Sequence, residues 1–208
     1  MIITLIGMSG IGKTHWSRFF KKLNYHMFSC DEMIEESLRP VLDAQGYAGL
    51  ADIAKWMGYP TDPQYEENSK KYLQYENESV QEICNYIDTH PKSNIVIDAT
   101  GSIIYIPQSF VLELKAKSTV VYLEATLEYA DQLYQRYITD PKPVIWGSSF
   151  HKGPFESTTS ALKRCYPELL DFRSEKYAAL ADITIPYDEH NSFDQTAPDL
   201  LSLIRSKI

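Results

Sequence analysis

Five short apolar runs recur along the chain, and longer segments with helical periodicity separate them. The runs span residues 2–6, 25–28, 95–97, 119–123 and 183–185. The third and fourth runs are continuous rather than alternating, which is typical of strands buried on both faces. Strands that alternate with helices favour a parallel sheet covered on both faces. The pattern therefore predicts an α/β fold with a five-stranded parallel sheet flanked by helices.

Seven segments have the apolar spacing of helices: residues 13–23, 31–38, 67–86, 106–115, 127–137, 158–180 and 197–204. Pro40 predicts the end of the second helix, because proline disrupts a helix interior. Thr196, followed by Ala197, Pro198 and Asp199, predicts a capping box at the start of the last helix. With 208 residues and no internal repeat, the chain is expected to form one domain, residues 1–208.

The segment directly after the first predicted strand matches the pattern G-x-x-x-x-G-K-[ST]. It consists of Gly7, Met8, Ser9, Gly10, Ile11, Gly12, Lys13 and Thr14. A strand, a glycine-rich turn and the start of a helix together point backbone N–H groups at phosphate oxygens. Lys13 is expected to reach the β- and γ-phosphates of ATP, and the Thr14 hydroxyl to bind Mg²⁺. The alternative is a glycine-rich turn with an incidental lysine.

Further candidates follow the other predicted strands, because ligands of open parallel sheets lie beyond the carboxyl ends of the strands. Asp98 is expected to hold Mg²⁺ near Thr14, and its alternative is to cap the next turn. Asp31 is expected to orient or deprotonate an acceptor hydroxyl, although it is equally compatible with a helix N-cap. Gly101 and Ser102 are expected to offer backbone N–H groups to a substrate, and their alternative is a plain turn.

Two regions are expected to cover the site. Residues 40–90 form a tyrosine-rich, substrate-binding helical cap, in which Tyr65, Tyr72 and Tyr75 are available to stack on an acceptor or to serve as core residues. Residues 139–157 form a mobile lid that contains Trp146 and Phe150 and brings a cation, Lys142 or Lys152, to the transferred phosphate. The alternative for the lid is an ordinary surface connection.

The amino-acid composition and the net charge argue against several classes of function. A formal net charge of −8 argues against a nucleic acid polymer as partner, because phosphate tracking needs clustered basic side chains. Three widely spaced cysteines suggest neither a disulfide framework nor a zinc site. No apolar stretch is long enough to span a membrane, and the short N-terminal apolar run leads straight into the phosphate loop. We therefore expect a cytoplasmic protein without a membrane partner, and a monomer by default.

Six blocks of sequence span almost the whole chain: the phosphate loop and residues 28–35 (FSCDEMIE), 99–102 (ATGS), 141–145 (PKPVI), 169–177 (LLDFRSEKY) and 181–185 (ADITI). In sequence and in order, these blocks resemble the shikimate kinase family. The resemblance implies a three-layer P-loop kinase fold that uses ATP and Mg²⁺. It also implies that Asp31 orients the substrate, Gly101 lies in a glycine turn, and Arg173 grips a substrate carboxylate. Arg136 matches an arginine that packs against adenine, and Lys142 takes the place of the lid arginine. Arg136 and Arg173 are equally compatible with surface ion pairs.

The chain departs from the family pattern at its substrate residues. Ser29 replaces the first acid of D-x-D, and the triple glycine becomes Gly101-Ser102-Ile103. In the segment that corresponds to F-R-x-x-E, Tyr72 replaces the phenylalanine and Leu73 stands where the family has its substrate arginine. The loss of that arginine is expected to cost on the order of 2–5 kcal/mol of affinity for a carboxylate substrate.

These patterns favour an ATP-dependent kinase for a hydroxyl group of a small metabolite, with an acceptor that differs from shikimate. Shikimate itself, a nucleoside or nucleotide acceptor, and a nucleotide-binding module with little catalysis are the alternatives. An ATPase that drives motion, or a DNA-directed enzyme, fits less well.

Overall fold

The computed structural model describes residues 1–125, 127–191 and 197–207. Its strands are β1 (Ile2–Ile6), β2 (His26–Ser29), β3 (Ile95–Asp98), β4 (Thr119–Leu123) and β5 (Ile183–Ile185). They form one sheet in the order β2-β3-β1-β4-β5, and every neighbouring pair is parallel. The predicted five-stranded parallel sheet is confirmed.

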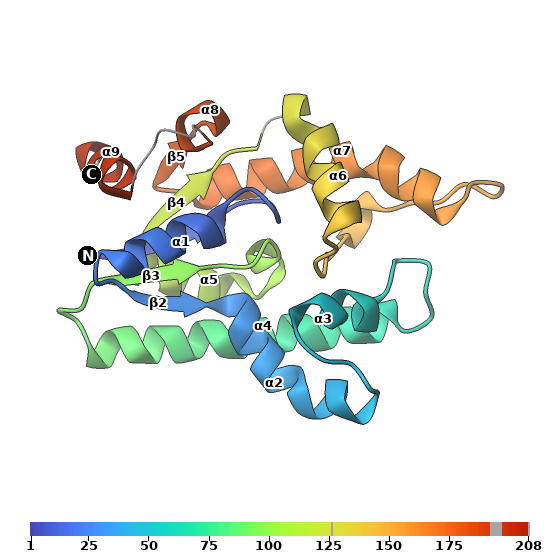
Figure 1. Cartoon of the computed structure of the whole chain (residues 1–208), viewed down its shortest axis with the longest axis horizontal. Helices are drawn as coiled ribbons and strands as arrows, with labels where there is room; N and C mark the ends of the chain where they lie inside the picture. The colour runs from blue at the N-terminus through green and yellow to red at the C-terminus, as the bar shows by residue number, and fades with distance from the viewer. Residues whose placement is uncertain (126, 192–196, 208) are drawn as a thin grey trace.

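Helices cover both faces of this sheet. They are α1 (Lys13–Lys22), α2 (Cys30–Ala44), α3 (Leu50–Met57), α4 (Tyr65–Thr89), α5 (Gln108–Lys117), α6 (Ala130–Thr139), α7 (Thr158–Leu180), α8 (Tyr187–His190) and α9 (Ala197–Lys207). Short 3₁₀ helices span Ile103–Tyr105, Leu127–Tyr129 and Gly147–Ser149. Figure 1 shows α1 in front of the sheet and α5 behind it, with α2 and α3 below the phosphate loop and α6 above. None of the described helices is long and apolar enough to cross a membrane.

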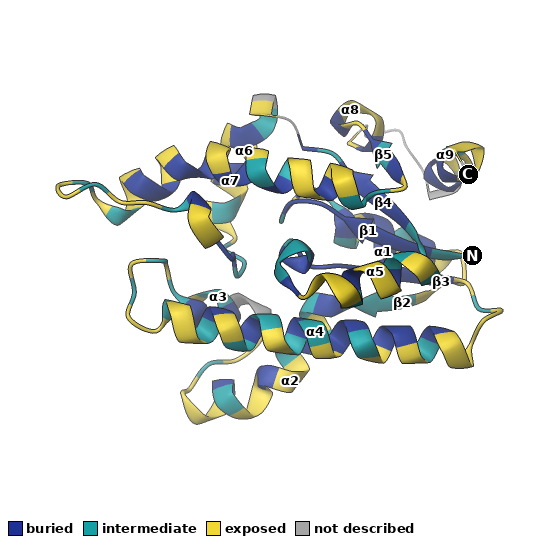
Figure 2. Ribbon diagram, turned by 180° about the vertical axis from the view of Figure 1, so that it is seen from behind, coloured by how far each residue is buried: buried dark blue, intermediate teal, exposed yellow. Residues whose placement is uncertain are grey.

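The sheet is the centre of the larger of two hydrophobic cores. Residues of β1, β3 and β4 are almost entirely buried, as Figure 2 shows in dark blue. The smaller core joins α2, α3 and α4 to one residue of the expected lid. Its members are Ile34, Leu38, Leu42, Ile53, Trp56, Met57, Tyr72 and Ile145. The substrate-side helices therefore pack around a core of their own next to the carboxyl ends of the strands.

The prediction that Pro40 ends the second helix is wrong. Helix α2 continues through Pro40 to Ala44, because its buried stripe of Ile34, Leu38 and Leu42 extends past the proline. Burial of that stripe in the smaller core outweighs the one backbone hydrogen bond that proline cannot donate. The capping box expected at Thr196 lies outside the described residues.

Helix α3 was not predicted from the sequence. Gly49 and Gly58, both with positive φ, flank this helix. In a sequence, such glycines indicate loops rather than the ends of a helix. Three of its side chains, Ile53, Trp56 and Met57, are nevertheless buried in the smaller core. Tertiary packing therefore stabilises a short helix that the local sequence does not predict.

Candidate active site

The phosphate loop depends on glycine where the chain leaves β1. Gly7 has a φ of +142°, and a Cβ atom there would lie 2.7 Å from the carbonyl oxygen of Leu123 at the end of β4. Gly12, with a φ of +111°, is the N-cap of α1. Both backbone conformations are unfavourable for residues with a side chain. The loop is therefore held tightly between the ends of two central strands and the start of a helix.

Lys13 lies against the inside of this loop. Its Nζ donates hydrogen bonds to the carbonyl oxygens of Gly7 (2.8 Å) and Met8 (3.0 Å), and only 8% of the residue is exposed. Burial lowers the pKa of Lys13, while the nearby carboxylates of Asp98 and Asp31 oppose that effect. The ammonium group is thus surrounded by acceptors within the cavity that the loop borders.

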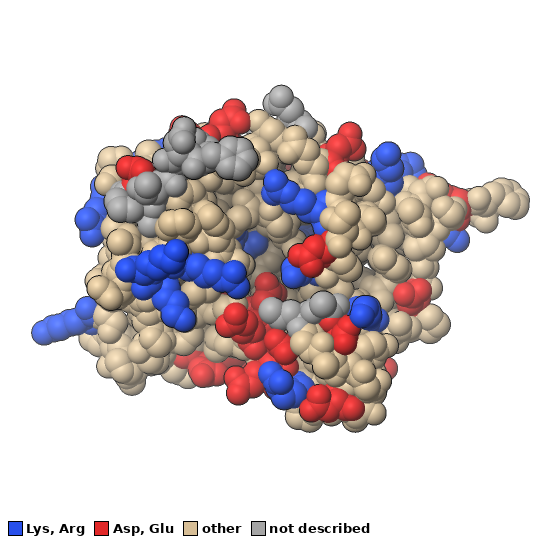
Figure 3. Space-filling model, viewed as in Figure 1, with Lys and Arg blue, Asp and Glu red and all other residues tan. Residues whose placement is uncertain are grey.

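That cavity, called here the phosphate cavity, has a volume of about 340 Å³. Its walls come from the phosphate loop, α1, the first turn of α2, α4, the end of β3 and the turn after it, the expected lid and α7. The lining residues are Ser9, Gly10, Gly12, Lys13, Thr14, Arg18, Asp31, Tyr72, Asp98, Gly101, Asp140, Lys142, Pro143 and Arg173. Figure 3 shows a hollow in the middle of this face, with acidic side chains gathered below it and basic ones to its left. The predicted strand-end residues Asp31, Asp98 and Gly101 meet here.

Asp98 ends β3 beside the end of β1, with Leu5 as its neighbour in the sheet. It is only 5% exposed, and burial raises its pKa to about 6, although Lys13 and a hydrogen bond with Thr14 oppose this. A carboxylate and a hydroxyl are the hard oxygen ligands that Mg²⁺ prefers, and the ion usually completes its shell with water and substrate phosphates. Among the described residues, no group of three or more His, Cys, Asp or Glu side chains is placed to hold a metal ion. Thr14 and Asp98 therefore fit a magnesium ion that phosphates help to bind.

Asp31 lies in the first turn of α2 and does not cap the helix. The N-cap is Ser29, whose hydroxyl accepts a hydrogen bond from the N–H of Glu32 (3.4 Å). The Tyr72 hydroxyl donates a hydrogen bond to Oδ1 of Asp31 (3.0 Å), and Tyr72 is only 2% exposed. Tyr72 is therefore a buried partner of Asp31 rather than an exposed stacking surface. The phenylalanine of the family pattern has no hydroxyl, and that difference is the signal that could have revealed this contact.

Ser102, unlike Gly101, does not line the cavity. Its N–H donates to Oγ1 of Thr100 (3.1 Å), and its hydroxyl donates to Oε2 of Glu76 (2.6 Å). Thr100 also donates to Oε1 of the same carboxyl group. The N–H of Ser102 expected to face a substrate is thus used inside the protein. Glu76 is fully buried, and burial raises its pKa to about 7 even though both hydroxyl groups favour its ionised form.

Arg173 lies at the deep end of the cavity on α7, and only 1% of it is exposed. Its Nη2 donates to the carbonyl oxygen of Ile145 (2.6 Å), and its guanidinium carbon is 5.3 Å from the centre of the Tyr105 ring. A Cβ atom on Gly101 would lie 3.0 Å from its Nη1. Arg173 is thus a buried cation rather than half of a surface ion pair, and the absence of a side chain at Gly101 leaves space for it.

Two further predicted residues, Arg136 of α6 and Lys142 of the expected lid, also contact or border the site. The exposed Arg136 of α6 donates from Nη1 to the carbonyl oxygen of Gly10 (2.8 Å), which ties α6 to the phosphate loop. Lys142 is 3.3 Å from the carboxylate of Asp140 and borders the phosphate cavity. Lys152, the second lid candidate, is exposed and does not line this cavity.

The expected lid is anchored near its middle. Val144, Ile145 and Trp146 are buried. The Tyr65 hydroxyl donates to the carbonyl oxygen of Val144 (3.0 Å) and accepts from the N–H of Trp146 (2.8 Å). Tyr65 begins α4, so these bonds connect the substrate-side helices to the lid. Tyr65 is thus a structural partner of the lid rather than a free surface for an acceptor.

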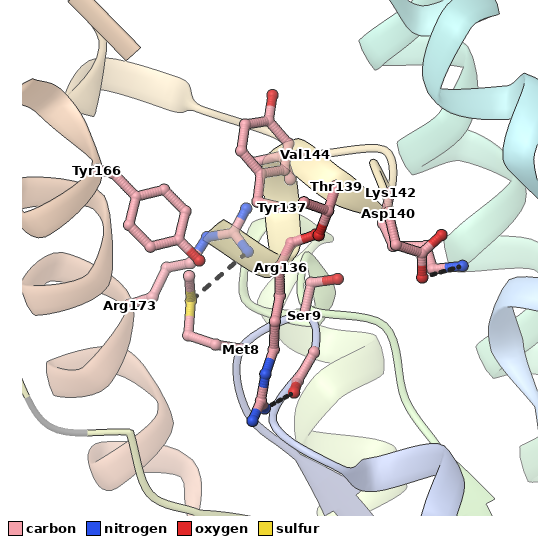
Figure 4. Close-up of a pocket in the computed structure, with 11 residues that line it drawn as sticks. Met8, Ser9, Arg136, Tyr137, Thr139, Asp140, Lys142, Val144, Tyr166 and Arg173 are labelled. Carbon is pink, nitrogen blue, oxygen red and sulfur yellow. Dashed lines mark hydrogen bonds and ion pairs between the residues drawn. The ribbon is translucent and has the colours of Figure 1, made fainter. Parts of the chain in front are cut away.

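A second cavity of about 310 Å³ adjoins the first and is called here the aromatic chamber. Its lining residues are Met8, Ser9, Gly10, Arg136, Tyr137, Thr139, Asp140, Lys142, Val144, Tyr166 and Arg173. Figure 4 shows the rings of Tyr137 and Tyr166 on one side of it and Arg136 reaching down to the phosphate loop. Tyr137 and Tyr166 were not predicted as site residues, because no local sequence pattern indicates a cavity wall formed by two packed helices.

Comparisons with known proteins agree at the level of the fold. No model of a known protein family matches the chain, and no curated protein matches its sequence. Among solved structures, shikimate kinase from Bacteroides thetaiotaomicron superposes with a TM-score of 0.64 at 18% identity, covering 99% of this chain and 98% of that one. Shikimate kinase from Acinetobacter baumannii, in complex with shikimate, superposes with a TM-score of 0.62 at 21% identity. The match covers 99% of this chain and 93% of that one.

The chain has a shikimate kinase-like P-loop fold. Another solved structure with this likeness is YorR from Bacillus subtilis in complex with phosphorylated GDP, with a TM-score of 0.50 at 15% identity over 99% of this chain and 96% of that one. At these identities the likeness concerns the arrangement of the elements. The shikimate kinase-like fold places the phosphate loop, Asp31 and Arg173 around one cavity, and the chemistry follows from those side chains.

Proposed function

We propose that this chain is a kinase that transfers the γ-phosphate of ATP to a hydroxyl group of a small metabolite. One observation supports this most directly: a single cavity is lined by Lys13, Thr14 and Asp98, which suit a nucleotide phosphate and its metal ion, and also by Asp31. Phosphoryl transfer requires a phosphate-binding set and a group that orients the attacking hydroxyl within one cavity.

The nucleotide side of the proposal uses the phosphate loop. Residues 7–14 direct backbone N–H groups at the phosphates, and Lys13 exchanges its loop carbonyl partners for the β- and γ-phosphate oxygens. Arg136, which already contacts Gly10, packs against the adenine. Thr14 and Asp98 hold Mg²⁺, which when bound neutralises charge that develops on the transferred group.

The acceptor side uses Asp31. Because Tyr72 occupies Oδ1 of Asp31, the other carboxylate oxygen is left to accept the proton of the attacking hydroxyl. Gly101 allows close approach of the acceptor, and Arg173 binds an anionic group on it. Lys142, which borders the cavity from the lid, stabilises the transferred phosphoryl group.

The identity of the acceptor is where the chain departs from the shikimate kinases that share its fold. The Acinetobacter baumannii enzyme was solved with shikimate, and shikimate is therefore the first compound to try. Two residues oppose it as the natural acceptor: Leu73, which packs partly buried against both cores where the family has an arginine, and Ser29, which caps α2. We therefore propose an acceptor other than shikimate.

ADP release from MgATP, with and without shikimate and a panel of hydroxyl-bearing metabolites and nucleosides, tests the proposal. Lys13→Ala serves as the blank, and Lys21→Ala, an exposed lysine on the same helix, is the matched control. Stimulation by one compound supports the kinase, and stimulation by shikimate would show that Leu73 and Ser29 are tolerated. ATP binding without stimulation by any acceptor would instead favour a nucleotide-binding module.

A further inference from the structure

The phosphate cavity and the aromatic chamber meet at Arg173. Both are lined by this arginine, and both are also lined by Ser9, Gly10, Asp140 and Lys142. A ligand that enters the phosphate cavity and reaches Arg173 therefore comes directly to the edge of the aromatic chamber. The shared wall makes the two cavities neighbouring parts of one site.

Much of the lining of the chamber is apolar. Tyr137 of α6 and Tyr166 of α7 have their ring centres 6.0 Å apart and their planes inclined by only 22°. Val144 of the lid and Met8 of the loop complete this lining, and both are buried. Aromatic rings and aliphatic side chains around a cavity of this size favour a planar or apolar group rather than a charged one.

Two residues that line the chamber, Arg173 and Tyr166, each have a polar group without a hydrogen-bond partner among the described residues. The Nε atom of Arg173 is buried and has no hydrogen-bond acceptor among the described residues, and no described carboxylate forms an ion pair with the guanidinium. The Tyr166 hydroxyl likewise has no hydrogen bond within the described part of the chain, although the residue is only 2% exposed. Figure 4 shows this hydroxyl directed towards Arg173.

A buried guanidinium without an anionic partner favours a ligand that supplies one, because burial of an unpaired charge is costly. Burial raises the pKa of Tyr166 to about 12, so its hydroxyl stays protonated and can donate to the same anion. The chamber therefore combines a site for one negative charge with an apolar space directly beyond it.

Building on the proposed kinase activity, we propose that the acceptor is an organic anion with an aromatic or other planar apolar substituent. Its hydroxyl lies at Asp31 in the phosphate cavity, its anionic group binds Arg173 and the Tyr166 hydroxyl, and its planar part occupies the chamber beside Tyr137 and Tyr166. Shikimate, a small polar ring, leaves the chamber empty in this arrangement.

Binding of three matched probes, measured by calorimetry, tests this assignment without requiring turnover. The probes are 3-phenyllactate, which has a hydroxyl, a carboxylate and a phenyl ring, lactate, which lacks the ring, and the amide of 3-phenyllactate, which lacks the charge. We expect 3-phenyllactate to bind at least tenfold more tightly than either of the others. Equal affinities, or no measurable binding of any probe, would overturn the assignment.

Two variants locate the probe. Tyr166→Phe keeps the aromatic wall and removes the hydroxyl, so 3-phenyllactate should bind several-fold more weakly. Tyr134→Phe is the matched control, because Tyr134 contacts the Tyr166 ring while its hydroxyl donates to the carbonyl oxygen of Thr159 (3.4 Å) and it does not line the chamber. An equal effect of both variants would contradict the assignment.

Saturation with a non-hydrolysable ATP analogue separates the chamber from the nucleotide site. We expect 3-phenyllactate to bind with the analogue present, and competition between the two would assign the chamber to the nucleotide and overturn the proposal. Because ADP release is measured separately, a failure of catalysis with intact probe binding would count against the kinase and not against the chamber.

Discussion

At the scale of single residues, the contact between Tyr72 and Asp31 connects the fold to the proposed chemistry. A buried phenol that donates to a carboxylate restricts the rotamers of the carboxylate and satisfies one of its oxygens. In the proposed reaction Tyr72 is therefore a positioning residue, because it would act only through Asp31.

Tyr72→Phe is expected to reduce the free energy of unfolding by roughly 1–3 kcal/mol, the range for a lost hydrogen bond to a carboxyl group. With an acceptor that stimulates ADP release, kcat should fall by about tenfold or more, which corresponds to about 1.4 kcal/mol, while the KM for ATP stays unchanged. Denaturant unfolding and steady-state kinetics measure the two effects. Tyr75→Phe is the control, since no hydrogen bond of the Tyr75 hydroxyl is found in the described ranges, and an equal loss there would argue against the specific contact.

The buried carboxyl group of Glu76 leads to a prediction about how the stability of the protein depends on pH. Its folded-state pKa of about 7 exceeds the ordinary value of 4.5, so the folded protein binds the proton more tightly than the unfolded chain. Stability should therefore fall as the pH rises from about 4.5 to 7, and ionisation above that range costs roughly 3 kcal/mol, at about 1.4 kcal/mol per pKa unit.

The variant Glu76→Gln isolates this effect from that of Asp98, whose pKa is raised in the same direction. A glutamine amide resembles the protonated carboxyl group and keeps one acceptor and one donor for Thr100 and Ser102. At pH 5 the two proteins should unfold at similar denaturant concentrations, and at pH 8 the variant should be more stable by roughly 2–3 kcal/mol. An identical pH dependence in both proteins would show that Glu76 does not titrate in this range.

At the scale of elements, α2 shows how tertiary packing overrides a local signal. Pro40 is exposed in the interior of the helix, and the buried residues before and after it keep the helix continuous. The proline therefore remains a local defect in an otherwise well-packed element.

Pro40→Ala should restore the missing backbone donor and remove the ring from the preceding turn. Because proline is about 3 kcal/mol less favourable than alanine inside a helix, we expect a gain of roughly 1–3 kcal/mol in the free energy of unfolding. Chemical denaturation measures this gain, with Arg39→Ala as a neighbouring exposed control. A loss of stability would mean that Pro40 itself is required for α2 to pack against α4.

At the scale of the whole molecule, the features that could be predicted are those that depend on a short stretch of sequence, namely the strands, the phosphate loop and the residues at strand ends. Continuous apolar runs predicted the buried strands, and the rule for strand ends predicted that Asp31 and Asp98 lie near the phosphate loop, where both line the phosphate cavity. The contact of Tyr72 with Asp31, the burial of Arg173 and the aromatic chamber were not predictable in this way. They depend on which residues of α4, α6 and α7 meet, and the apolar period of a helix indicates its buried face but not the element that packs against it.

The difference between local sequence signals and three-dimensional packing also explains the wrong expectation for Ser102. Ser102 follows a strand, as a substrate-binding residue would, yet its N–H and hydroxyl are used by Thr100 and Glu76. Only the three-dimensional arrangement reveals that the buried Glu76 lies close enough to bond it. Residue type and position predicted several residues that line the cavity, and the hydrogen-bond partners determine which of their groups remain available to a ligand.

Nucleotide binding should be visible in the stability of the whole molecule, independently of any acceptor. A ligand that binds only the folded state at 100 times its Kd adds about 2.7 kcal/mol, and for a chain of this size each kcal/mol raises Tm by about 2–4 °C. Saturating MgATP should therefore raise Tm by roughly 5–10 °C in the wild type and in Lys21→Ala, and by much less in Lys13→Ala. Because Lys13 is buried against the loop carbonyls, its removal also alters the starting stability, so the ligand-induced shift and not the absolute Tm is compared. An equal shift in Lys13→Ala would mean that ATP is not bound through the phosphate loop, and the proposed geometry of transfer would then be wrong.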